Sequence, residues 1–474
     1  MLLVRVMLAR KPASLRFAGA KGALKHTLPG QLGMGLDRPD EHYNLLHPGK
    51  GAPHEQRGVV IHWERHAAAG KQWIKLKPND PRIPEIFRAD MGKRDTFITV
   101  NEFDGWRYIR SLRSLRALYV DLDDQTDSYA VLDALIEARL PGPNIIVSSG
   151  TGLNLYWLLE PLPPKALPVW QRCQDALIKA LKPLGADSAA KDCTRLLRVV
   201  GTRNKGEEVK AIVLDGHHWA LRQIAFEILG TEGRGQKPKG LHPARGLHPA
   251  RGLHPARAEI RDIRARRANP DKAIRGSIYA RWHLVYQDLL RISAHHGHQI
   301  PEGYRDKWLF LAGVALSWFT HPQGIEHELV SLGGAHTDLN GPEIAQAGQP
   351  SLKRALQAAA GHKLEWVAPG TGRVEMVDPR YRFRRQTLYD WVGDLIPASL
   401  MPKMRAIIPD DEGQKRKKCR DKARYATHYT GQGVRAFNEE KRATARLLRA
   451  QGATYRAIAA EIGVDYKTAW TWCQ

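Results

Sequence analysis

The chain has 474 residues, of which 43% are hydrophobic, and its 73 Lys and Arg residues exceed its 49 Asp and Glu residues to give a formal net charge of +24. This length is too great for a single hydrophobic core, so we expect about two to four domains. No apolar run approaches the length of a membrane span, and we therefore expect a soluble protein with no membrane partner. The excess of positive charge favours a polyanionic partner, with nucleic acid ranked before a membrane surface.

The cysteines are widely spaced and form no CxxC pair; they are Cys173, Cys193, Cys419 and Cys473. Zinc ribbons and disulfide frameworks need paired spacing, so this pattern argues against both. We therefore expect reduced thiols in a cytoplasmic protein.

Composition divides the chain into six regions. We expect a basic, disordered segment at 1–41, a globular domain at 42–232, a linker at 233–267, a helical domain at 268–365, a basic connecting region at 366–436 and a helix-turn-helix at 437–474. The linker holds three tandem copies of GLHPAR, in which Gly and Pro prevent a helix. In the globular domain, the pattern predicts strands at 96–100, 117–123, 145–147, 153–157 and 209–214, and helices at 128–140 and 168–181. This mixture predicts an α+β domain.

Two carboxylates end the strand at 117–123. Because side chains alternate along a strand, Asp121 and Asp123 lie on one face and Leu122 on the other. Beside a third carboxylate, such a pair can bind one or two Mg²⁺ or Mn²⁺ ions through oxygen ligands. An isolated Asp-x-Asp after an apolar run is common, so the pair gains meaning only from the motifs that follow.

A turn rich in Ser and Gly follows the strand at 145–147. Gly150 and Gly152 let the backbone approach a phosphate, the hydroxyls of Ser148 and Ser149 add donors, and Asn154 lies on the next strand. The pattern predicts a hairpin that carries a phosphate cradle, although an ordinary hairpin has the same composition.

The segment GADSAAKDCTRLLRVVGTRNKG offers the third carboxylate, as either Asp187 or Asp192. Arginines and neighbouring polar groups follow, and they can neutralise a triphosphate through bidentate hydrogen bonds. The candidate nucleotide-binding residues in this segment are Arg195, Arg198, Asn204 and Lys205.

The last 38 residues, about 437–474, read as three short helices with a turn at Gly463. Ile458, Ala459, Ile462 and Val464 occupy the core positions of a helix-turn-helix. This pattern predicts that the third helix presents its exposed side chains to the major groove of DNA. Those residues are Tyr466, Lys467, Thr468 and Thr471.

The order DLD, SSGTGLNLYW and then D followed by TRLLRVVGTRNK resembles the archaeo-eukaryotic primase superfamily, and in particular the replication primases and primase-polymerases of plasmids and phages. The resemblance implies a catalytic domain of small sheets flanked by helices, followed by an all-α domain; the C-terminal segment is similar to the helix-turn-helix of resolvases and transposases. It also implies that Asp121, Asp123 and Asp187 are catalytic and hold two metal ions, with Asp192 as the alternative third ligand. Asn154 stands where the family usually has His, and an amide cannot carry that charge.

These observations favour a metal-dependent DNA primase or primase-polymerase, a nucleotidyltransferase that uses nucleoside triphosphates on a single-stranded DNA template. We expect it to initiate replication of a plasmid, phage or integrated element in a bacterial or phage-infected cell, and to bind duplex origin DNA through the helix-turn-helix. One alternative is a DNA-binding initiator whose primase fold has lost catalysis, and a weaker one is a DDE-type transposase. The sequence contains no GxxxxGK[ST], so we expect a separate replicative helicase.

Overall fold

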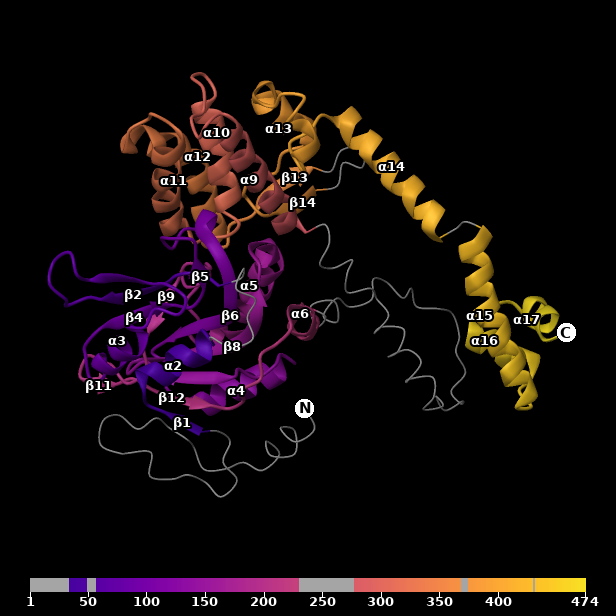
Figure 1. Cartoon of the computed structure of the whole chain (residues 1–474), viewed down its shortest axis with the longest axis horizontal. Coiled ribbons are helices and arrows are strands. Elements are labelled where there is room, and N and C mark those ends of the chain that lie inside the picture. The colour runs from indigo at the N-terminus through magenta and orange to yellow at the C-terminus, as the bar shows by residue number, and fades with distance from the viewer. Residues whose placement is uncertain (1–33, 49–56, 230–276, 368–373, 429–430) are drawn as a thin grey trace. The chain divides into compact units, whose positions relative to one another are not determined.

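The computed structural model describes residues 34–48, 57–229, 277–367, 374–428 and 431–474, without the side chains of 424–438 (Figure 1). The chain divides into two compact units, Met1–Arg382 and Phe383–Gln474. The linker predicted at 233–267 lies outside the described residues, as does most of the predicted disordered segment at 1–41.

The larger sheet of the first unit is antiparallel throughout, with the strand order β1-β12-β7-β8-β6-β5. Strands β6, β7, β8 and β12 confirm predicted strands. Strand β1 lies in the segment predicted to be disordered, where it pairs with β12, so the ordered domain begins before the predicted boundary at residue 42. The strands are β1 (Met34–Leu36), β5 (Glu102–Phe103), β6 (Leu112–Asp123), β7 (Ile145–Ser148), β8 (Gly152–Leu162) and β12 (Lys210–Val213).

A smaller antiparallel sheet has the order β3-β2-β4-β9. Its strands are β2 (Val60–Glu64), β3 (Trp73–Leu76), β4 (Thr96–Thr99) and β9 (Leu196–Arg198). Next to it, β10 (Arg203–Asn204) and β11 (Glu207–Glu208) form a tight hairpin. Lys205 (φ 50°) and Gly206 (φ 91°) make the turn, and two successive positive φ angles are typical of a type I′ hairpin.

Helix α5 (Leu167–Leu181) packs against β6 and contacts both α4 (Ser128–Glu137) and α6 (Leu221–Leu229). Its buried side chains reach the β6 backbone: Trp170 Nε1 donates to the Ala117 carbonyl at 2.9 Å, and Gln174 Oε1 accepts from the Tyr119 amide at 3.1 Å. Short 3₁₀ turns, η3 (Pro164–Ala166) and η4 (Lys182–Leu184), flank α5. The helix therefore holds β6, the strand that ends in Asp121 and Asp123, in a fixed position.

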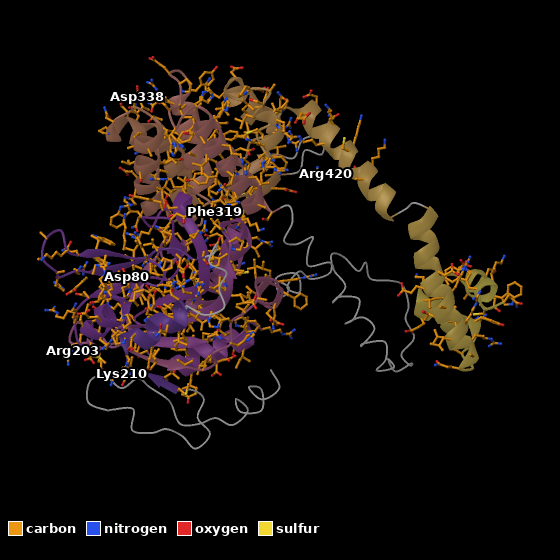
Figure 2. The ribbon with its side chains drawn as sticks, viewed as in Figure 1. Asp80, Arg203, Lys210, Phe319, Asp338 and Arg420 are labelled. Carbon is orange, nitrogen blue, oxygen red and sulfur yellow. The ribbon has the colours of Figure 1, made fainter. Side chains whose placement is uncertain are left out.

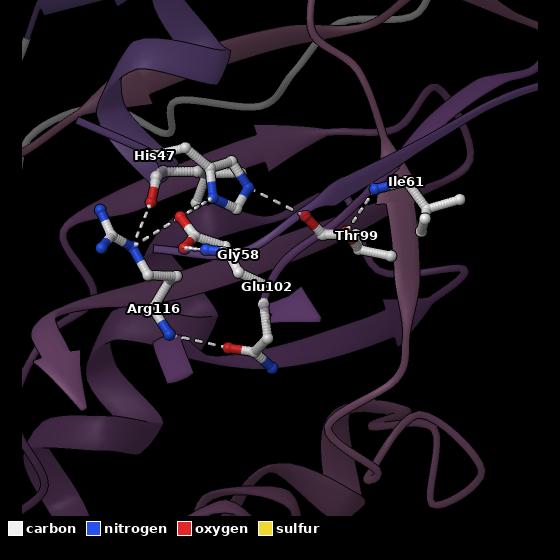
Figure 3. A network of polar contacts seen from close by, with 8 residues as sticks. His47, Gly58, Ile61, Thr99, Glu102 and Arg116 are labelled. Carbon is white, nitrogen blue, oxygen red and sulfur yellow. Dashed lines mark hydrogen bonds and ion pairs between the residues drawn. The ribbon is translucent and has the colours of Figure 1, made fainter. Parts of the chain in front are cut away.

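A buried polar network joins the two sheets (Figure 3). Glu102 on β5 accepts from the Gly58 amide at 2.8 Å and lies 3.1 Å from His47 and 3.6 Å from Arg116, while the other His47 nitrogen contacts the Thr99 carbonyl of β4 at 3.0 Å. Burial raises the pKa of the Glu102 carboxyl. His47, Arg116 and the Gly58 amide together lower it by more, so the net pKa lies below its usual value. The carboxylate is thus charged and paired, as a buried ion requires.

Two short helices complete this region, α2 (Pro39–Leu46) and α3 (Ile83–Ala89). On α2, His42 packs edge-on against Tyr156 of β8 and accepts from the Val200 amide, so α2 contacts the larger sheet and the segment after β9. Burial holds the pKa of His42 at about 3, which keeps its imidazole neutral.

Four helices follow in the same unit, so the described part of 268–365 is helical, as the sequence pattern predicted. They are α9 (Ile278–His295), α10 (Arg305–Leu316), α11 (Pro322–His336) and α12 (Gly341–Ala359). Phe319, which follows α10, is buried against His283 of α9, and Figure 2 shows it at the end of these helices nearest β6. The basic connecting region predicted at 366–436 is more structured than expected: β13 (Leu364–Val367) and β14 (Val374–Val377) form a hairpin across its start.

The second unit holds α13 (Arg385–Val392), α14 (Asp410–His428), α15 (Gly431–Ala450), α16 (Tyr455–Ile462) and α17 (Tyr466–Cys473), with 3₁₀ turns η6 (Gly393–Leu395) and η7 (Met401–Lys403). Part of the basic connecting region predicted at 366–436, the charged run GQKRKKCRDKAR, lies on α14, where Arg420 is exposed (Figure 2). The last three helices share a small core that confirms the buried positions Ile458, Ala459 and Ile462 and leaves Val464 partly buried. Among the helices that the structure describes, none is both long and apolar enough to cross a bilayer.

Candidate active site

The candidate site lies at the end of β6, the long central strand of the larger sheet. Asp121 is half-buried, Leu122 is buried and Asp123 is exposed, as the strand alternation predicts. The neighbouring strand β8 pairs Asn154 with Asp121 and Gly152 with Asp123. The Asp-x-Asp and the Ser/Gly turn, which are separated in sequence by a helix, therefore meet at one edge.

Gly152 is required for this meeting. A Cβ at this position would lie 2.2 Å from the Leu122 carbonyl oxygen, inside any allowed contact. The absence of a side chain lets β8 start directly against β6, so the glycine positions the turn beside the carboxylates.

The third carboxylate reaches the site through backbone pairing. The Asp187 amide donates to the Asp121 carbonyl at 2.8 Å, and the Asp123 amide donates to the Gly185 carbonyl at 3.3 Å. Gly185 has a φ of 90°, and a Cβ there would lie 2.8 Å from the Asp123 carbonyl oxygen. The segment around Asp187 thus pairs with the end of β6 along the edge opposite β8.

Arg195 lies between two of these carboxylates. Its Nη2 is 3.3 Å from Asp187 Oδ2 and 3.7 Å from Asp121 Oδ2. Burial raises the pKa of Asp121, Arg195 opposes that effect, and the negative charges of Asp123 and Asp187 reinforce it. The hydrogen bond from Asn154 also lowers the pKa of Asp121, but the net pKa lies above its usual value, with burial as the main cause.

Asp192 has different partners. Its Oδ1 accepts from the Thr194 amide at 2.9 Å and from the Thr194 hydroxyl at 2.6 Å, and its Oδ2 lies 3.5 Å from the Thr320 hydroxyl. It therefore organises its own loop, whereas Asp187 shares Arg195 with Asp121. This geometry favours Asp187 as the third carboxylate.

Asn154, which stands where a histidine was expected, donates from Nδ2 to Asp121 Oδ1 at 2.6 Å. The amide is buried and aligns the carboxylate without adding charge. The sequence placed Asn154 on the strand of the predicted phosphate cradle; in the structure its Nδ2 donates to Asp121.

The Ser/Gly turn is closed by its own hydrogen bonds. The Ser149 hydroxyl donates to the Gly152 carbonyl at 3.1 Å, and the Ser149 carbonyl accepts from Asn204 Nδ2 at 2.6 Å. Gly150 has a φ of 93°, which favours glycine. Ser149 and Asn204 therefore shape the loop, and Ser148 is half-buried beside it.

Arg198 is held by three groups of the smaller sheet region. Its Nη2 donates to Asp95 at 3.0 Å and to Asn204 at 2.9 Å, and its guanidinium lies 4.7 Å from the centre of the Phe97 ring. Asp95 and Phe97 were missed by the sequence reasoning, and the only signal was their place in DTFITV, on a strand that pairs with β9. Lys205 is exposed at the tip of the β10-β11 hairpin.

The donor set suits a hard divalent cation in ligand type, because all three candidate groups are carboxylates. Burial raises the pKa of Asp121, and a bound cation would lower this pKa because it favours the charged carboxylate. Within the described ranges, however, no group of three His, Cys, Asp or Glu side chains has the spacing to hold a metal ion. The two-metal prediction therefore remains a proposal, to be tested by metal binding.

In the second unit, the predicted DNA-contacting residues lie on α17. Tyr466 is 51% exposed, and Lys467 and Thr471 are exposed. Thr468 differs, since its hydroxyl donates to the Asp465 carboxylate at 2.6 Å and helps to cap the helix. Trp470, which the sequence reasoning missed, is 46% exposed on the same helix.

Comparison with known proteins gives one relative in sequence. No protein-family model matches the chain. Over 192 residues the chain is 30% identical to a replication protein of Clostridium perfringens, a match that covers 38% of this chain and 47% of that protein. The chain thus spans about half the length of this curated relative.

The chain is also similar to three solved structures. The archaeo-eukaryotic primase domain of the cyanophage S-2L primase-polymerase is 18% identical, with 40% of this chain and 95% of that chain covered and a TM-score of 0.30. The catalytic domain of primase RepB′ in complex with initiator DNA is 16% identical (42% and 100% covered, TM-score 0.27), and primase RepB′ itself is 14% identical (68% and 99% covered, TM-score 0.25). The sequence relationship is thus to part of a replication protein, and the carboxylate, Ser/Gly and arginine motifs of this chain meet in one α+β region.

Proposed function

We propose that the chain is a metal-dependent DNA primase or primase-polymerase, which joins nucleoside triphosphates on a single-stranded DNA template to initiate replication. The observation that carries this proposal is the meeting of Asp121, Asp123 and Asp187 at the end of β6, with Arg195 beside them. The sequence relationship to a replication protein is the second support.

In this proposal the residues of the chain divide the work of binding and alignment. Asp121, Asp123 and Asp187 would hold Mg²⁺ or Mn²⁺, which when bound would activate a 3′-hydroxyl and stabilise the leaving pyrophosphate. Asn154 fixes the orientation of Asp121 through its 2.6 Å hydrogen bond. Arg198, whose position Asp95 and Asn204 fix, would meet the triphosphate with little reorganisation.

Arg195 has a further role in this scheme. Without substrate, it neutralises Asp121 and Asp187. A triphosphate offers the guanidinium a stronger bidentate partner, so substrate binding would draw Arg195 away and release the carboxylates for metal. Arg195 thus couples nucleotide binding to metal binding.

The test is primer synthesis by the purified chain on single-stranded DNA with Mg²⁺ or Mn²⁺ and labelled nucleotides. The variant Asp121→Asn keeps the shape of the side chain and removes its charge, and it should abolish product. The matched control is Asp124→Asn, because Asp124 is exposed, lies next to the site and has a positive φ that Asn tolerates. Equal activity of the wild-type protein and the Asp121 variant would refute the assignment.

A second candidate is a DNA-binding replication initiator without catalysis. One observation favours it: Arg195 and Asn154 already engage the Asp121 carboxylate, and the described carboxylates do not form a metal-binding group as they stand. Such a protein would bind DNA normally, would make no primer with either metal, and would show no Mn²⁺ binding that depends on Asp187.

We propose that the second unit recognises duplex origin DNA through α17, on the basis of the exposed Tyr466, Lys467 and Thr471. Unwinding would come from a separate helicase. ATP-driven unwinding by the purified chain would contradict that part of the proposal.

A further inference from the structure

The outer face of the smaller sheet carries a row of side chains that crosses all four strands, with aromatic rings on three of them. Direct cross-strand pairs join Trp73 on β3 to Trp63 on β2, Trp63 to Phe97 on β4, and Phe97 to Arg198 on β9. Residues that are directly opposite share a face of the sheet, so these four side chains stand in one line.

The rings in this row stack on one another. The Trp63 ring lies 5.2 Å from the Trp73 ring at 18° and 5.0 Å from the Phe97 ring at 28°. Trp106, from the segment between β5 and β6, adds a fourth ring edge-on to Trp73 at 6.2 Å. We call Trp106, Trp73, Trp63 and Phe97 the aromatic row.

The aromatic row is a surface and not a core. Trp73 is 38% exposed and Trp106 is 43% exposed, while the opposite face of the same sheet is closed by buried residues such as Ile98 and Leu197. A two-faced antiparallel sheet normally presents polar residues to water. A contiguous aromatic face therefore indicates a binding surface.

Cations are interleaved with the rings. Lys75 Nζ lies 4.2 Å from the centre of the Trp106 ring, and the guanidiniums of Arg65 and Arg107 lie 5.6 Å from Trp63 and 5.7 Å from Trp73, respectively. Among the described residues, no carboxylate forms an ion pair with Arg65 or Lys75. The surface thus combines stacking groups with positive charge that is not neutralised.

Both ends of the aromatic row lead to the candidate active site. At one end Arg198 shares Asn204 with the Ser/Gly turn. At the other, Arg107 donates to the Thr194 carbonyl at 3.3 Å, next to Arg195. Hydrogen bonds therefore tie the aromatic row to the Ser/Gly turn and to the segment that carries Arg195.

We infer that the aromatic row binds unpaired DNA, with bases stacked on the exposed tryptophans and phosphates held by Arg65, Lys75 and Arg107. Unpaired strands expose both the base faces and the phosphates that such a surface needs, whereas a duplex hides its base faces. The inference deepens the proposed function and rests on it, since it assigns the surface that would hold the template.

The experiment measures binding of the full chain to a short labelled oligothymidine by fluorescence anisotropy, over a range of salt concentrations. Trp73→Ala and Trp106→Ala should each weaken binding by roughly five- to hundred-fold, with the salt dependence unchanged because no phosphate contact is lost. Lys75→Ala should lower the slope of log K against log salt by about 0.7. Trp366→Ala is the matched control, because Trp366 is 46% exposed on the β13-β14 hairpin, away from the row.

Two further measurements keep the outcomes distinct. Trp73→Phe retains a stacking ring and should recover most of the affinity, which separates lost stacking from lost folding. Affinity for a duplex should stay unchanged in all the aromatic variants. The inference is overturned if Trp73→Ala and Trp106→Ala bind oligothymidine as the Trp366 control does, or if they lose duplex binding equally.

Failure of the proposed function would look different. If the wild-type chain makes no primer but the aromatic variants still lose affinity for oligothymidine and not for duplex DNA, the inference is supported and the proposed catalytic activity is refuted. If primer synthesis is observed and the aromatic variants bind oligothymidine and make primers like the wild-type protein, the proposed catalytic activity is supported and the inference is refuted.

Discussion

Glu328 on α11 gives a quantitative prediction for how the helical part of the first unit docks on its α+β part. Its carboxyl is only 3% exposed and accepts from the Ile109 amide of η2 (Ile109–Ser111) at 3.0 and 3.2 Å. Burial raises the pKa of Glu328 to about 8, with the Ile109 hydrogen bond acting in the opposite direction and Asp192 adding repulsion. Nearby, Arg110 Nη2 donates to Ser331 at 3.0 Å across the same contact.

The sign of the effect follows from where the protons are. In the unfolded chain the Glu328 carboxyl loses its proton near pH 4.5, whereas in the folded chain it keeps this proton until about pH 8. Between these values the folded state binds more protons, so the stabilisation is complete below pH 4.5 and is lost as the pH rises through 8. At about 1.36 kcal/mol for each pH unit, the whole shift corresponds to about 5 kcal/mol.

The assay is urea unfolding of the wild-type protein and of Glu328→Gln, at a series of pH values from about 5 to 9. The variant is a neutral isostere that cannot titrate. We expect its free energy of unfolding to rise relative to that of the wild-type protein by up to about 1.4 kcal/mol per pH unit across this range. Glu326→Gln is the control, because Glu326 is exposed on the same helix. If the wild-type protein and Glu328→Gln show parallel pH profiles, Glu328 is ionised in the folded protein and the reasoning fails.

Four further predictions concern the candidate site and α17. Arg195→Ala should tighten Mn²⁺ binding in the absence of nucleotide and raise the KM for nucleotide; a change in neither, by calorimetry and steady-state kinetics, would exclude the proposed coupling. Asn154→Leu should lower primer synthesis at least tenfold, because a lost hydrogen bond to a charged group corresponds to roughly 1.5–3 kcal/mol, whereas Asn154→His should keep activity; equal rates in a primer-extension assay would show that the contact is incidental. Gly152→Ala should destabilise the first unit by more than about 2 kcal/mol in urea unfolding, since its Cβ would lie 2.2 Å from the Leu122 carbonyl oxygen. Lys467→Ala should weaken duplex binding and lower its salt slope by about 1, without changing oligothymidine binding; an unchanged duplex slope would remove α17 from the interface.

Local sequence patterns predicted the elements on which the site is built. The alternation around Leu122 placed Asp121 and Asp123 on one face, and the predicted turn at Gly463 lies between α16 and α17, where Gly463 has a positive φ. These features depend on side-chain period and on the conformational freedom of glycine, both of which are written in neighbouring residues.

Tertiary pairing decided which residues meet. Sequence reasoning left Asp187 and Asp192 open; the structure pairs the Asp187 amide with the Asp121 carbonyl and holds Asp192 on Thr194, and the metal role of Asp187 stays a proposal. The start of the ordered domain was misplaced because β1 is a strand only through its pairing with β12. The aromatic row could not be read from the sequence, because its members lie on three separate strands and a loop that only the register of the sheet aligns. Cross-strand register is set by long-range pairing and burial, and no local pattern specifies it.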